Sequence, residues 1–415
     1  MRKRDKRGIY AWALYDWANS AFATAVMAGF FPVFFRQYWS SAADVTVATF
    51  RLGLANTLAS LVIALSAPLL GAVSDIHRKK KAFLAAFALL GITATGGLFF
   101  VPEGRYLAAM SLYVAATLGF MGGNVFYDSL LLDVAPVGAL DRVSALGYAL
   151  GYIGGGILFA GCVCMALSPE TFGFATRASA TRAAFMAVAA WWGLFSIPLF
   201  ACVRPAPGRV KGITGNSIQK WGRSLLETLG IMTRDRNVVL FLLGYWLYID
   251  GVGTVIRMAV DYGMAIGLKP RNLILALLVT QFVGFPATLV FGRIGERWGP
   301  KRGILLGLAG YLAIVAGSLI ITRGRDFMML AVAVGLVQGG VQSLSRSLFA
   351  RLVPRGREAT FFGVYNMLGR FAAVLGPVLM GATAFLTKAP RLGILSVGVL
   401  FLGGACFLSL VREKT

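Results

Sequence analysis

The stretch GAVSDIHRKKK at residues 71–81 decides the fold, because a variant of it returns at residues 292–302 as GRIGERWGPKR. Each copy follows a long apolar run, places an acidic residue four positions after a glycine, and continues with basic residues. The residues that form the pattern are Gly71, Asp75 and Arg78 in the first copy and Gly292, Glu296 and Arg297 in the second. Such a recurrence within one chain indicates internal duplication.

Two further pairs of segments correspond in the same order along the chain. LYDWANSAF in the first apolar run matches LYIDGVGTV in the seventh, which aligns Asp16 with Asp250. GGNVFYDSLLLDVAP in the fourth run matches GGVQSLSRSLFARLVP in the tenth when both are counted back from the final proline, which aligns Asp128 with Arg346. Three correspondences in one order predict two related halves.

The composition places most of the chain in a lipid bilayer. The 415 residues are 58% hydrophobic and 14% charged, whereas soluble domains average roughly 25% charged residues. Apolar runs of about 20 residues, which cross the hydrocarbon core as a helix, recur throughout the sequence. We therefore predict an all-α membrane protein with twelve transmembrane helices, at residues 10–37, 49–73, 82–101, 106–134, 142–167, 181–203, 237–263, 272–293, 302–322, 327–350, 359–387 and 391–411. The first run is too long for a cleaved signal sequence, so we expect it to remain as a spanning helix.

The distribution of basic residues predicts the orientation. The formal net charge is +23, and most of the 40 Lys and Arg residues lie between apolar runs, in alternate connections. The positive-inside rule then places both termini in the cytoplasm (N-in and C-in), with the chain crossing the inner (plasma) membrane many times. Basic residues scattered in this way form no nucleic-acid-binding face, so we expect no nucleic acid among the partners.

One long cytoplasmic connection, residues 204–236, separates the two halves. Its second part repeats apolar residues every three or four positions, opposite charged residues. This pattern predicts an amphipathic helix that lies in the membrane interface and contacts anionic lipid headgroups. Its apolar residues are Ile218, Trp221, Leu225, Leu229 and Met232. The predicted domains are six-helix bundles at residues 1–203 and 237–415, joined by this linker.

The sequence argues against enzyme chemistry. The single histidine, His77, lies in a basic connection, and the four cysteines lie in apolar runs without the spacing of a zinc site. The chain also lacks a nucleotide-binding loop of the Gly-x-x-x-x-Gly-Lys type. We therefore expect no enzymatic activity, no metal and no cofactor.

Charged residues inside the predicted spans are the candidates for function. An ionised side chain at mid-bilayer costs about 2.5–3.5 kcal/mol or more, so such residues pair with one another or face water. Those that lie more than three residues from the end of a span are Asp16, Asp128, Asp250, Arg257, Arg346 and Arg370. Because three acids balance three bases, we expect ion pairs among them.

Polar residues also recur at helical spacing and so share faces of their helices. These stripes are Asn124 with Asp128, Asp250 with Thr254 and Arg257, and Gln338 with Gln342 and Arg346. Each stripe can face a water-filled cavity, or it can hold packed helices together.

The duplicated loop resembles the signature of major facilitator superfamily transporters. Within that superfamily, the segments YDWANSAF, DRVSALGYALGYIGGG, GGVQSLSRSLFARLVP and FFGVYNMLGRFAAVLGP resemble the branch of the autophagy-related vacuolar amino-acid effluxers and their bacterial relatives. The resemblance covers nearly the whole chain. It implies the major facilitator fold, with two pseudo-symmetric six-helix bundles around a cavity lined by the first, fourth, seventh and tenth spans, alternating access, and export of small solutes. The polar stripes lie on these spans, so we expect them to line the cavity.

The resemblance also implies that the two duplicated loops act as gates. The first copy departs from the superfamily pattern, in which an arginine directly follows the acid. We therefore expect gating at this loop to depend on Arg78 and Lys79.

The aligned positions suggest roles for individual residues. Asp128 and Arg346 occupy matching positions in opposite halves, and we expect them to form an ion pair that closes the cytoplasmic side. Arg370, one turn from Asn366, is the first candidate for binding a substrate carboxylate, because a guanidinium is a permanently charged bidentate donor. The alternative partner of Arg370 is Asp250.

Proton coupling requires a carboxyl group whose surroundings change with conformation. Asp16 and Asp250 are the best candidates, because burial and a neighbouring base act on a carboxyl group in opposite directions. Tyr152 and Tyr248 belong to a set of aromatic residues suited to lining the cavity, and Asn19 lies one turn from Asp16.

We therefore predict a monomeric secondary active transporter of a small solute, such as a neutral amino acid or a related metabolite, with protons as the candidate coupling ion. One alternative is an exporter of lipids or amphipathic drugs, because aromatic cavities suit those cargoes too. Another is a non-transporting sensor built on a transporter fold, against which the intramembrane charges argue.

Overall fold

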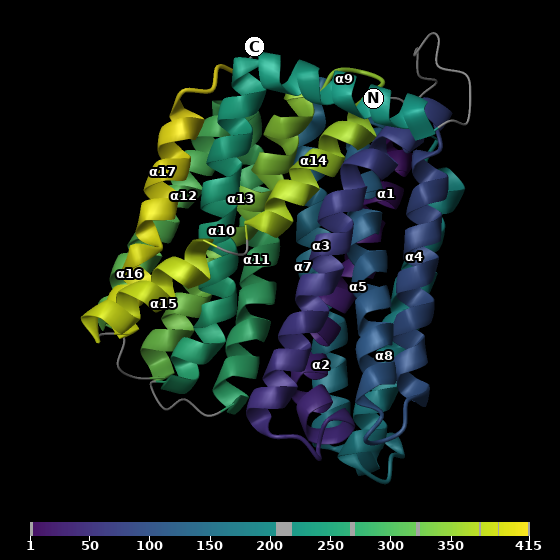
Figure 1. Ribbon diagram of the computed structural model, residues 1–415, viewed down its shortest axis with the longest axis vertical. Helices are drawn as coiled ribbons and strands as arrows, with labels where there is room; N and C mark the ends of the chain where they lie inside the picture. Colours follow the sequence, from purple (N-terminus) through teal and green to yellow (C-terminus); the bar gives the residue numbers. More distant parts are fainter. Residues whose placement is uncertain are drawn as a thin grey trace.

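The computed structural model describes residues 3–204, 218–265, 270–320, 324–372, 375–388 and 390–413. This part of the chain is almost entirely helical and contains no β-strand. Most helices run along one common direction and form two groups side by side, one from each half of the sequence (Figure 1). Helices are the expected response of long apolar runs to lipid, because a helix satisfies its backbone hydrogen bonds internally.

The first half begins with a long helical run that changes its winding. Helix α1 (Lys3–Ala21) continues as a π-helix (Phe22–Phe30), a short helix α2 (Phe31–Phe34) and a second π-helical turn (Phe35–Trp39). The remaining helices of this half are α3 (Val45–His77), α4 (Lys80–Gly97), α5 (Tyr106–Ser129), α6 (Leu131–Val134), α7 (Leu140–Leu167) and α8 (Arg177–Cys202).

The second half contains more interruptions. Its helices are α9 (Ile218–Arg234), α10 (Arg236–Ala265), α11 (Pro270–Trp298), α12 (Pro300–Gly317), α13 (Gly324–Leu352), α14 (Glu358–Phe371), α15 (Leu375–Thr387), α16 (Pro390–Ser396) and α17 (Gly398–Ser409). The run expected at residues 359–387 is therefore two helices, α14 and α15, and the run expected at 391–411 comprises α16 and α17. In Figure 1, α15 is inclined to α14 rather than continuing along its axis.

Eleven helical segments of the described residues are long and apolar enough to cross a membrane. They coincide with the predicted spans except for the ninth, at residues 302–322. That stretch is helical as α12, but α12 is not among the eleven segments. Its first turn contains Lys301 and Arg302, which lower its average hydropathy.

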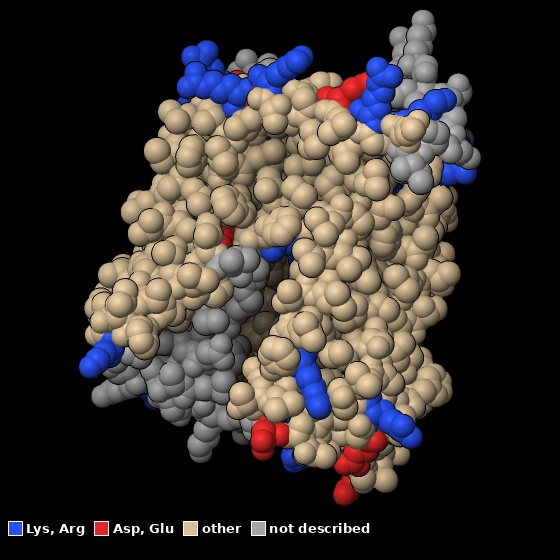
Figure 2. All heavy atoms as spheres, in the orientation of Figure 1, with Lys and Arg blue, Asp and Glu red and all other residues tan. Residues whose placement is uncertain are grey.

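Both chain ends and α9 lie at one end of the molecule (Figure 1). Basic side chains gather along this same end (Figure 2). Helix α9 packs against α3, α10 and α14. Met232 is buried, as is Thr228 on an adjacent part of the helix surface, so much of the predicted apolar face of α9 packs against protein.

Candidate functional site

A polar cavity of about 380 Å³ lies between the two halves. Helices α1, α5 and α7 of the first half and α10, α13 and α14 of the second contribute to it. A hollow between the halves is visible on the face shown in Figure 2. The sequence-predicted residues that line the cavity are Asp16, Asn19, Asn124, Asp128, Tyr152, Gln338, Gln342, Arg346, Asn366 and Arg370.

Arg346 on α13 is the centre of the polar network. Its Nη1 atom lies 3.0 Å from Oδ1 of Asp128 on α5, and its Nη2 atom lies 3.4 Å from Oδ2 of Asp16 on α1. Its Nε atom donates to the hydroxyl of Ser144 at 2.9 Å, and Nη2 donates to the Ser144 carbonyl at 2.9 Å. One buried arginine of the second half therefore binds three helices of the first, and the predicted Asp128–Arg346 pair is present.

Aromatic rings enclose the Arg346 guanidinium. Its Cζ atom lies 4.3 Å from the ring centre of Tyr148, 4.9 Å from that of Trp12 and 5.4 Å from that of Tyr127. A cation over aromatic faces is attracted by their electron density, and more strongly when both groups are shielded from water. The Tyr127 hydroxyl also donates to Asp16 Oδ2 at 2.9 Å. These rings keep the ion pairs in a water-poor environment.

Helix α14 adds two predicted residues to the cavity wall. The Asn366 amide donates to Oδ2 of Asp128 at 3.1 Å, so this carboxylate is bound from α13 and α14 at once. Arg370, one turn further along α14, also lines the cavity. The cavity therefore brings a second guanidinium within reach of a bound solute, beside the one held by the two acids.

Uncharged polar residues occupy other parts of the wall. The Asn19 amide donates to Asn124 Oδ1 at 2.7 Å, which joins α1 to α5. The Tyr152 hydroxyl donates to Gln342 Oε1 at 3.4 Å, which joins α7 to α13. Gln338 lies one turn from Gln342 and lines the same space. The predicted stripes on α5 and α13 therefore serve both purposes: they face the cavity and also hold the helices together.

Not every predicted site residue lines this cavity. Tyr248 is fully buried, and its hydroxyl lies 2.7 Å from that of Ser345. Asp250 is also fully buried, and its carboxylate accepts backbone N–H groups of Leu375 and Gly376 at the start of α15. The side chain of Arg257 lies outside the described residues.

The first duplicated segment contacts the other half of the protein. Asp75, near the end of α3, accepts the backbone N–H groups of Ala359 at 3.0 Å and Thr360 at 2.8 Å, and the Thr360 hydroxyl at 2.7 Å. A carboxylate is stabilised there because the start of α14 has unpaired N–H groups and a positive dipole end. Gly71 permits this contact, since a Cβ at that position would lie 2.8 Å from the Thr360 Cα atom.

A buried lysine supports the same contact. Lys80 Nζ lies 3.2 Å from Asp133 of the first half and 3.2 Å from Glu358 of the second. Arg78 and Lys79, on which we expected gating at this loop to depend, are exposed, and Arg78 has the left-handed backbone conformation that ends α3. Lys80 is thus a basic residue of this loop that joins the two halves through ion pairs.

The second duplicated segment behaves differently. Gly292 packs beside Ala145 of α7, and its acid and base, Glu296 and Arg297, are exposed. Another acid supplies the ionic contact in this region: Asp141 at the start of α7 lies 2.6 Å from Arg351 of α13. The duplication therefore preserves the close approach of the helices at the glycine, while the charged partners differ.

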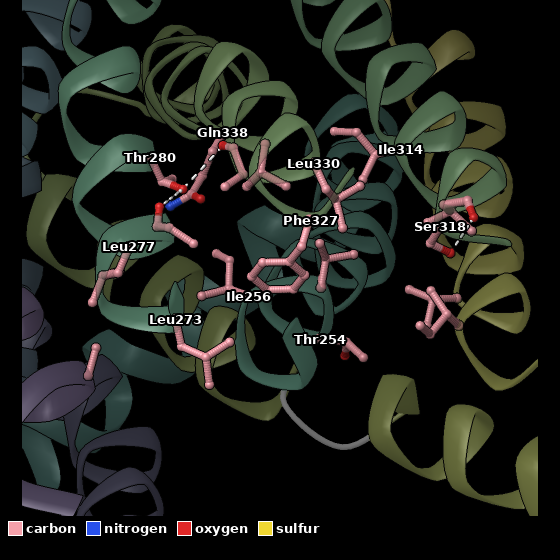
Figure 3. Close-up of a pocket in the computed structure, with 18 of the residues that line it drawn as sticks. Thr254, Ile256, Leu273, Leu277, Thr280, Ile314, Ser318, Phe327, Leu330 and Gln338 are labelled. Atoms are coloured by element: carbon pink, nitrogen blue, oxygen red, sulfur yellow. Dashed lines mark hydrogen bonds between the residues drawn. The ribbon is translucent and has the colours of Figure 1, made fainter. Parts of the chain in front are cut away.

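A second compartment, of about 280 Å³, opens beside the polar cavity and is mainly apolar (Figure 3). Its lining includes Ile256, Leu273 and Phe327, with Thr280 and Gln338 at one side. The two spaces have several lining residues in common: Ala23, Thr24, Ile256, Gln281 and Gln338. The sequence did not reveal this compartment, because its residues resemble any other apolar positions on packed helices.

Sequence and structure comparisons give a consistent family. The family model described as "Vacuole effluxer Atg22 like" matches residues 41–136 and 132–415. The uncharacterized MFS-type transporter YxiO of Bacillus subtilis is 37% identical, over 100% of this chain and 97% of its own length. Autophagy-related protein 22 of Pyricularia oryzae is 27% identical over 60% of this chain, an alignment that spans 40% of the fungal protein.

Solved structures show the same fold. The human organic anion transporter MFSD10 superposes with a TM-score of 0.75 over 98% of this chain and 100% of its own, at 14% identity. The proton:xylose symporter XylE superposes with a TM-score of 0.72 over 99% of this chain and 95% of its own, at 13% identity. These relatives are transporters rather than enzymes. The chain is thus a multi-pass membrane protein with the major facilitator fold, and it belongs to the Atg22-like effluxer family.

Proposed function

We propose that this protein is a secondary active transporter that moves a small amphipathic solute, such as a neutral amino acid, across the plasma membrane by alternating access. The observation that carries the proposal is the union of the polar cavity with the apolar compartment. Arg370 lies on the polar side, and residues such as Phe327 line the apolar side. A solute with a carboxylate and an apolar group matches both.

The proposed topology has twelve spans in two pseudo-symmetric bundles, residues 1–203 and 237–415. Helix α12 completes the twelve as the ninth span in chain order, since it packs between α11, α13 and α17 as a member of the second bundle. The end with both termini and α9 is the cytoplasmic end, because basic side chains gather there. Residues 204–236 form the linker, and the exposed basic residues of α9, such as Arg223, face anionic headgroups. We propose that the protein works as a monomer.

Alternating access follows from where the halves meet. Three contacts join the halves near the proposed cytoplasmic end. Asp75 of α3 accepts N–H groups of α14, Lys80 pairs with an acid from each half, and Arg351 pairs with Asp141. The Arg346 network lies deeper, at the cavity. This conformation is therefore closed toward the cytoplasm, and release of these contacts would open it.

Direction and coupling are proposed from the same network. Asp16 and Asp128 share one guanidinium, so protonation of one carboxyl would loosen the link between the halves without leaving Arg346 unpaired. The matched family is named for effluxers, which supports export. We propose proton-coupled export, with Asp16 as the carboxyl that exchanges the proton.

One observation favours a second candidate function. The apolar compartment is large relative to a single amino-acid side chain, and the structurally similar MFSD10 is an organic anion transporter. A larger amphipathic anion, such as a drug or a lipid, would place its charge near Arg370 and its body in the apolar compartment.

Binding and transport measurements would separate these cargoes. Purified protein is screened by thermal shift with amino acids, short peptides and amphipathic drugs, and the stabilising compounds are tested for uptake into proteoliposomes with and without a pH gradient. Arg370→Ala should abolish the shift given by carboxylate-bearing compounds, while Arg355→Ala, at an exposed position, should retain it. Equal shifts in both variants would remove Arg370 from the proposed site.

A further inference from the structure

Asp250 lies in the middle of α10, yet it bonds to another helix. Its Oδ2 atom accepts the backbone N–H of Leu375 at 2.8 Å and that of Gly376 at 3.1 Å. Its Oδ1 atom accepts the hydroxyl of Thr254, one turn along α10, at 3.3 Å. These N–H groups belong to the first turn of α15, where a helix has no internal acceptors for them. Asp250 therefore caps α15 from a neighbouring helix.

Helix α15 also approaches α10 too closely for a side chain at the contact. A Cβ added to Gly376 would lie 2.8 Å from Cβ of Thr254 and 3.0 Å from Oδ1 of Asp250. Real Cβ atoms essentially never approach other atoms within 3.0 Å. The capping bonds and the absent side chain at Gly376 thus act together to set where α15 begins.

The position of α15 in turn shapes the apolar compartment. Met380, five residues into α15, lines this space together with Thr254 and Ile256 of α10. Thr254 is therefore both a partner of Asp250 and part of the wall. On the other side of the helix break, Arg370 and Ala372 line the polar cavity. The interruption between α14 and α15 thus separates the parts of this span that line the two spaces.

We propose that Asp250 is a positioning residue for the apolar compartment. By capping α15 it fixes the wall that contains Met380, and so it sets the size of the apolar group that the transporter accepts. The effect on solute selectivity rests on the proposed function, whereas the capping of α15 does not. Asp250 is not among the described residues that line either space, so the proposed role involves no direct contact with the solute.

Two substitutions of Asp250 separate capping from charge. Asn is nearly as good a capping residue as Asp, whereas Ala cannot accept a hydrogen bond from the helix. Hydrogen–deuterium exchange of the α15 peptide is expected to accelerate about 5-fold in Asp250→Ala and to stay close to the wild-type rate in Asp250→Asn. The peptide of α17 serves as the internal reference. Unchanged exchange in Asp250→Ala, or equally fast exchange in both variants, would overturn the proposal.

A matched glycine pair tests the position of α15 without altering the acid. Gly376→Ala would push α15 away from Thr254. Gly381→Ala, on the same helix, adds a methyl group that has no neighbour within 4 Å. We expect faster exchange of the α15 peptide in Gly376→Ala only. Because this pair leaves Asp250 intact, it also gives an answer if Asp250→Ala fails to fold. Equal exchange in the two glycine variants would contradict the inferred contact.

Transport selectivity provides the readout that loss of stability alone would not change. Counterflow of leucine is compared with that of alanine in proteoliposomes, since the two share charged groups and differ in the apolar one. The leucine-to-alanine ratio should change at least 3-fold in Gly376→Ala and Asp250→Ala and should be retained in Asp250→Asn and Gly381→Ala. An unchanged ratio would refute the selectivity role. If the wild-type protein moves neither amino acid, the proposed function fails, while the exchange experiment still decides whether Asp250 caps α15.

Discussion

The Nη1 atom of Arg346 lies 3.0 Å from Oδ1 of Asp128, although the two residues are 218 positions apart and belong to opposite halves of the chain. Both side chains are almost completely excluded from solvent. Breaking a buried ion pair by removing one partner typically costs about 3–5 kcal/mol, because the other charge is left uncompensated. Contact between the halves and neutralisation of the cavity acids are therefore linked through Arg346.

Replacing Arg346 by Ala should open the end of the molecule that has both termini. Asp16 and Asp128 would then repel each other, and the closed conformation would lose their shared partner. Opening can be followed with Ala359→Cys, whose side chain is fully buried beside Asp75, in a background without the four native cysteines. A membrane-impermeant maleimide should label this cysteine at least 10-fold faster in the Arg346→Ala variant.

The charge swap Asp128→Arg with Arg346→Asp provides the control for that experiment. It restores one cation and one anion at the same two positions, so labelling should return toward the wild-type rate. If Arg346→Ala leaves labelling unchanged, the ion pair does not contribute to closure. If the swap labels as fast as the single variant, the rest of the Arg346 network, including Ser144, matters more than the pair.

Gly71→Ala should prevent the same end from closing by steric means alone. The added methyl group would lie 2.8 Å from the Thr360 Cα atom, and backbone atoms cannot move aside as a side chain can. Gly53→Ala is the matched control, because it lies on the same helix and its added Cβ meets nothing within 4 Å. The Ala359→Cys reporter should therefore react faster in Gly71→Ala and at the wild-type rate in Gly53→Ala. Slow labelling in both variants would show that α3 and α14 can separate slightly without opening a path.

Asp16→Asn should separate solute exchange from uphill transport. The substitution removes a titratable group but leaves the Arg346–Asp128 pair, so counterflow without a gradient should persist. Accumulation driven by a pH gradient should be lost, because the proposed proton site is absent. Both activities can be measured in the same proteoliposomes with a compound identified by the thermal-shift screen.

Two other outcomes for Asp16→Asn would each correct the proposal. Retention of uphill transport would show that another group exchanges the proton. Loss of counterflow as well would show that Asp16 is needed for binding or for the structure of the cavity, where it also accepts a hydrogen bond from Tyr127. Asp128→Asn, which weakens the direct link between the halves, should impair closure in the labelling assay and thus differ from Asp16→Asn.

Much of the polar site could be predicted because the sequence is duplicated. Aligning the fourth and tenth spans placed Asp128 opposite Arg346, and the structure joins them. Helical spacing likewise grouped Gln338 with Gln342 on a face that lines the cavity. These inferences needed only the helical periodicity and the number of residues from a shared proline, and both correspond directly to positions on the folded helices.

The residues that were missed depend on how helices begin and end. Three consecutive lysines follow Arg78, and only the start of α4 decides that Lys80 is the buried one. The alignment of Asp16 with Asp250 suggested similar roles, but it did not reveal that the Asp250 carboxylate accepts backbone N–H groups at the start of α15. Pro377 was an available signal for that break, since proline is favoured in the first turn of a helix and disfavoured within one.

The contact between α9 and the segment before α14 supports the last prediction. The Arg357 guanidinium donates to the Thr228 hydroxyl, which is buried, and lies 3.7 Å from Glu227, which is half exposed. A hydrogen bond from a charged group contributes about 1.5–3 kcal/mol, whereas an exposed ion pair contributes about 0–1 kcal/mol. Arg357→Ala should therefore lower the thermal stability of the purified protein clearly, and Glu227→Gln should change it little. Tryptophan fluorescence follows the unfolding, and one of the eight tryptophans, Trp221 of α9, packs against His77 of α3.

The same pair of variants shows whether α9 restrains the closed conformation. Arg357 directly precedes α14, the helix that Asp75 caps, so releasing α9 should also loosen that cap. Ala359→Cys should then be labelled faster with Arg357→Ala but not with Glu227→Gln. A loss of stability without faster labelling would mean that α9 stabilises the fold and takes no part in closure. Equal effects of both variants on stability would mean that the exposed ion pair, and not the buried hydroxyl, holds α9 in place.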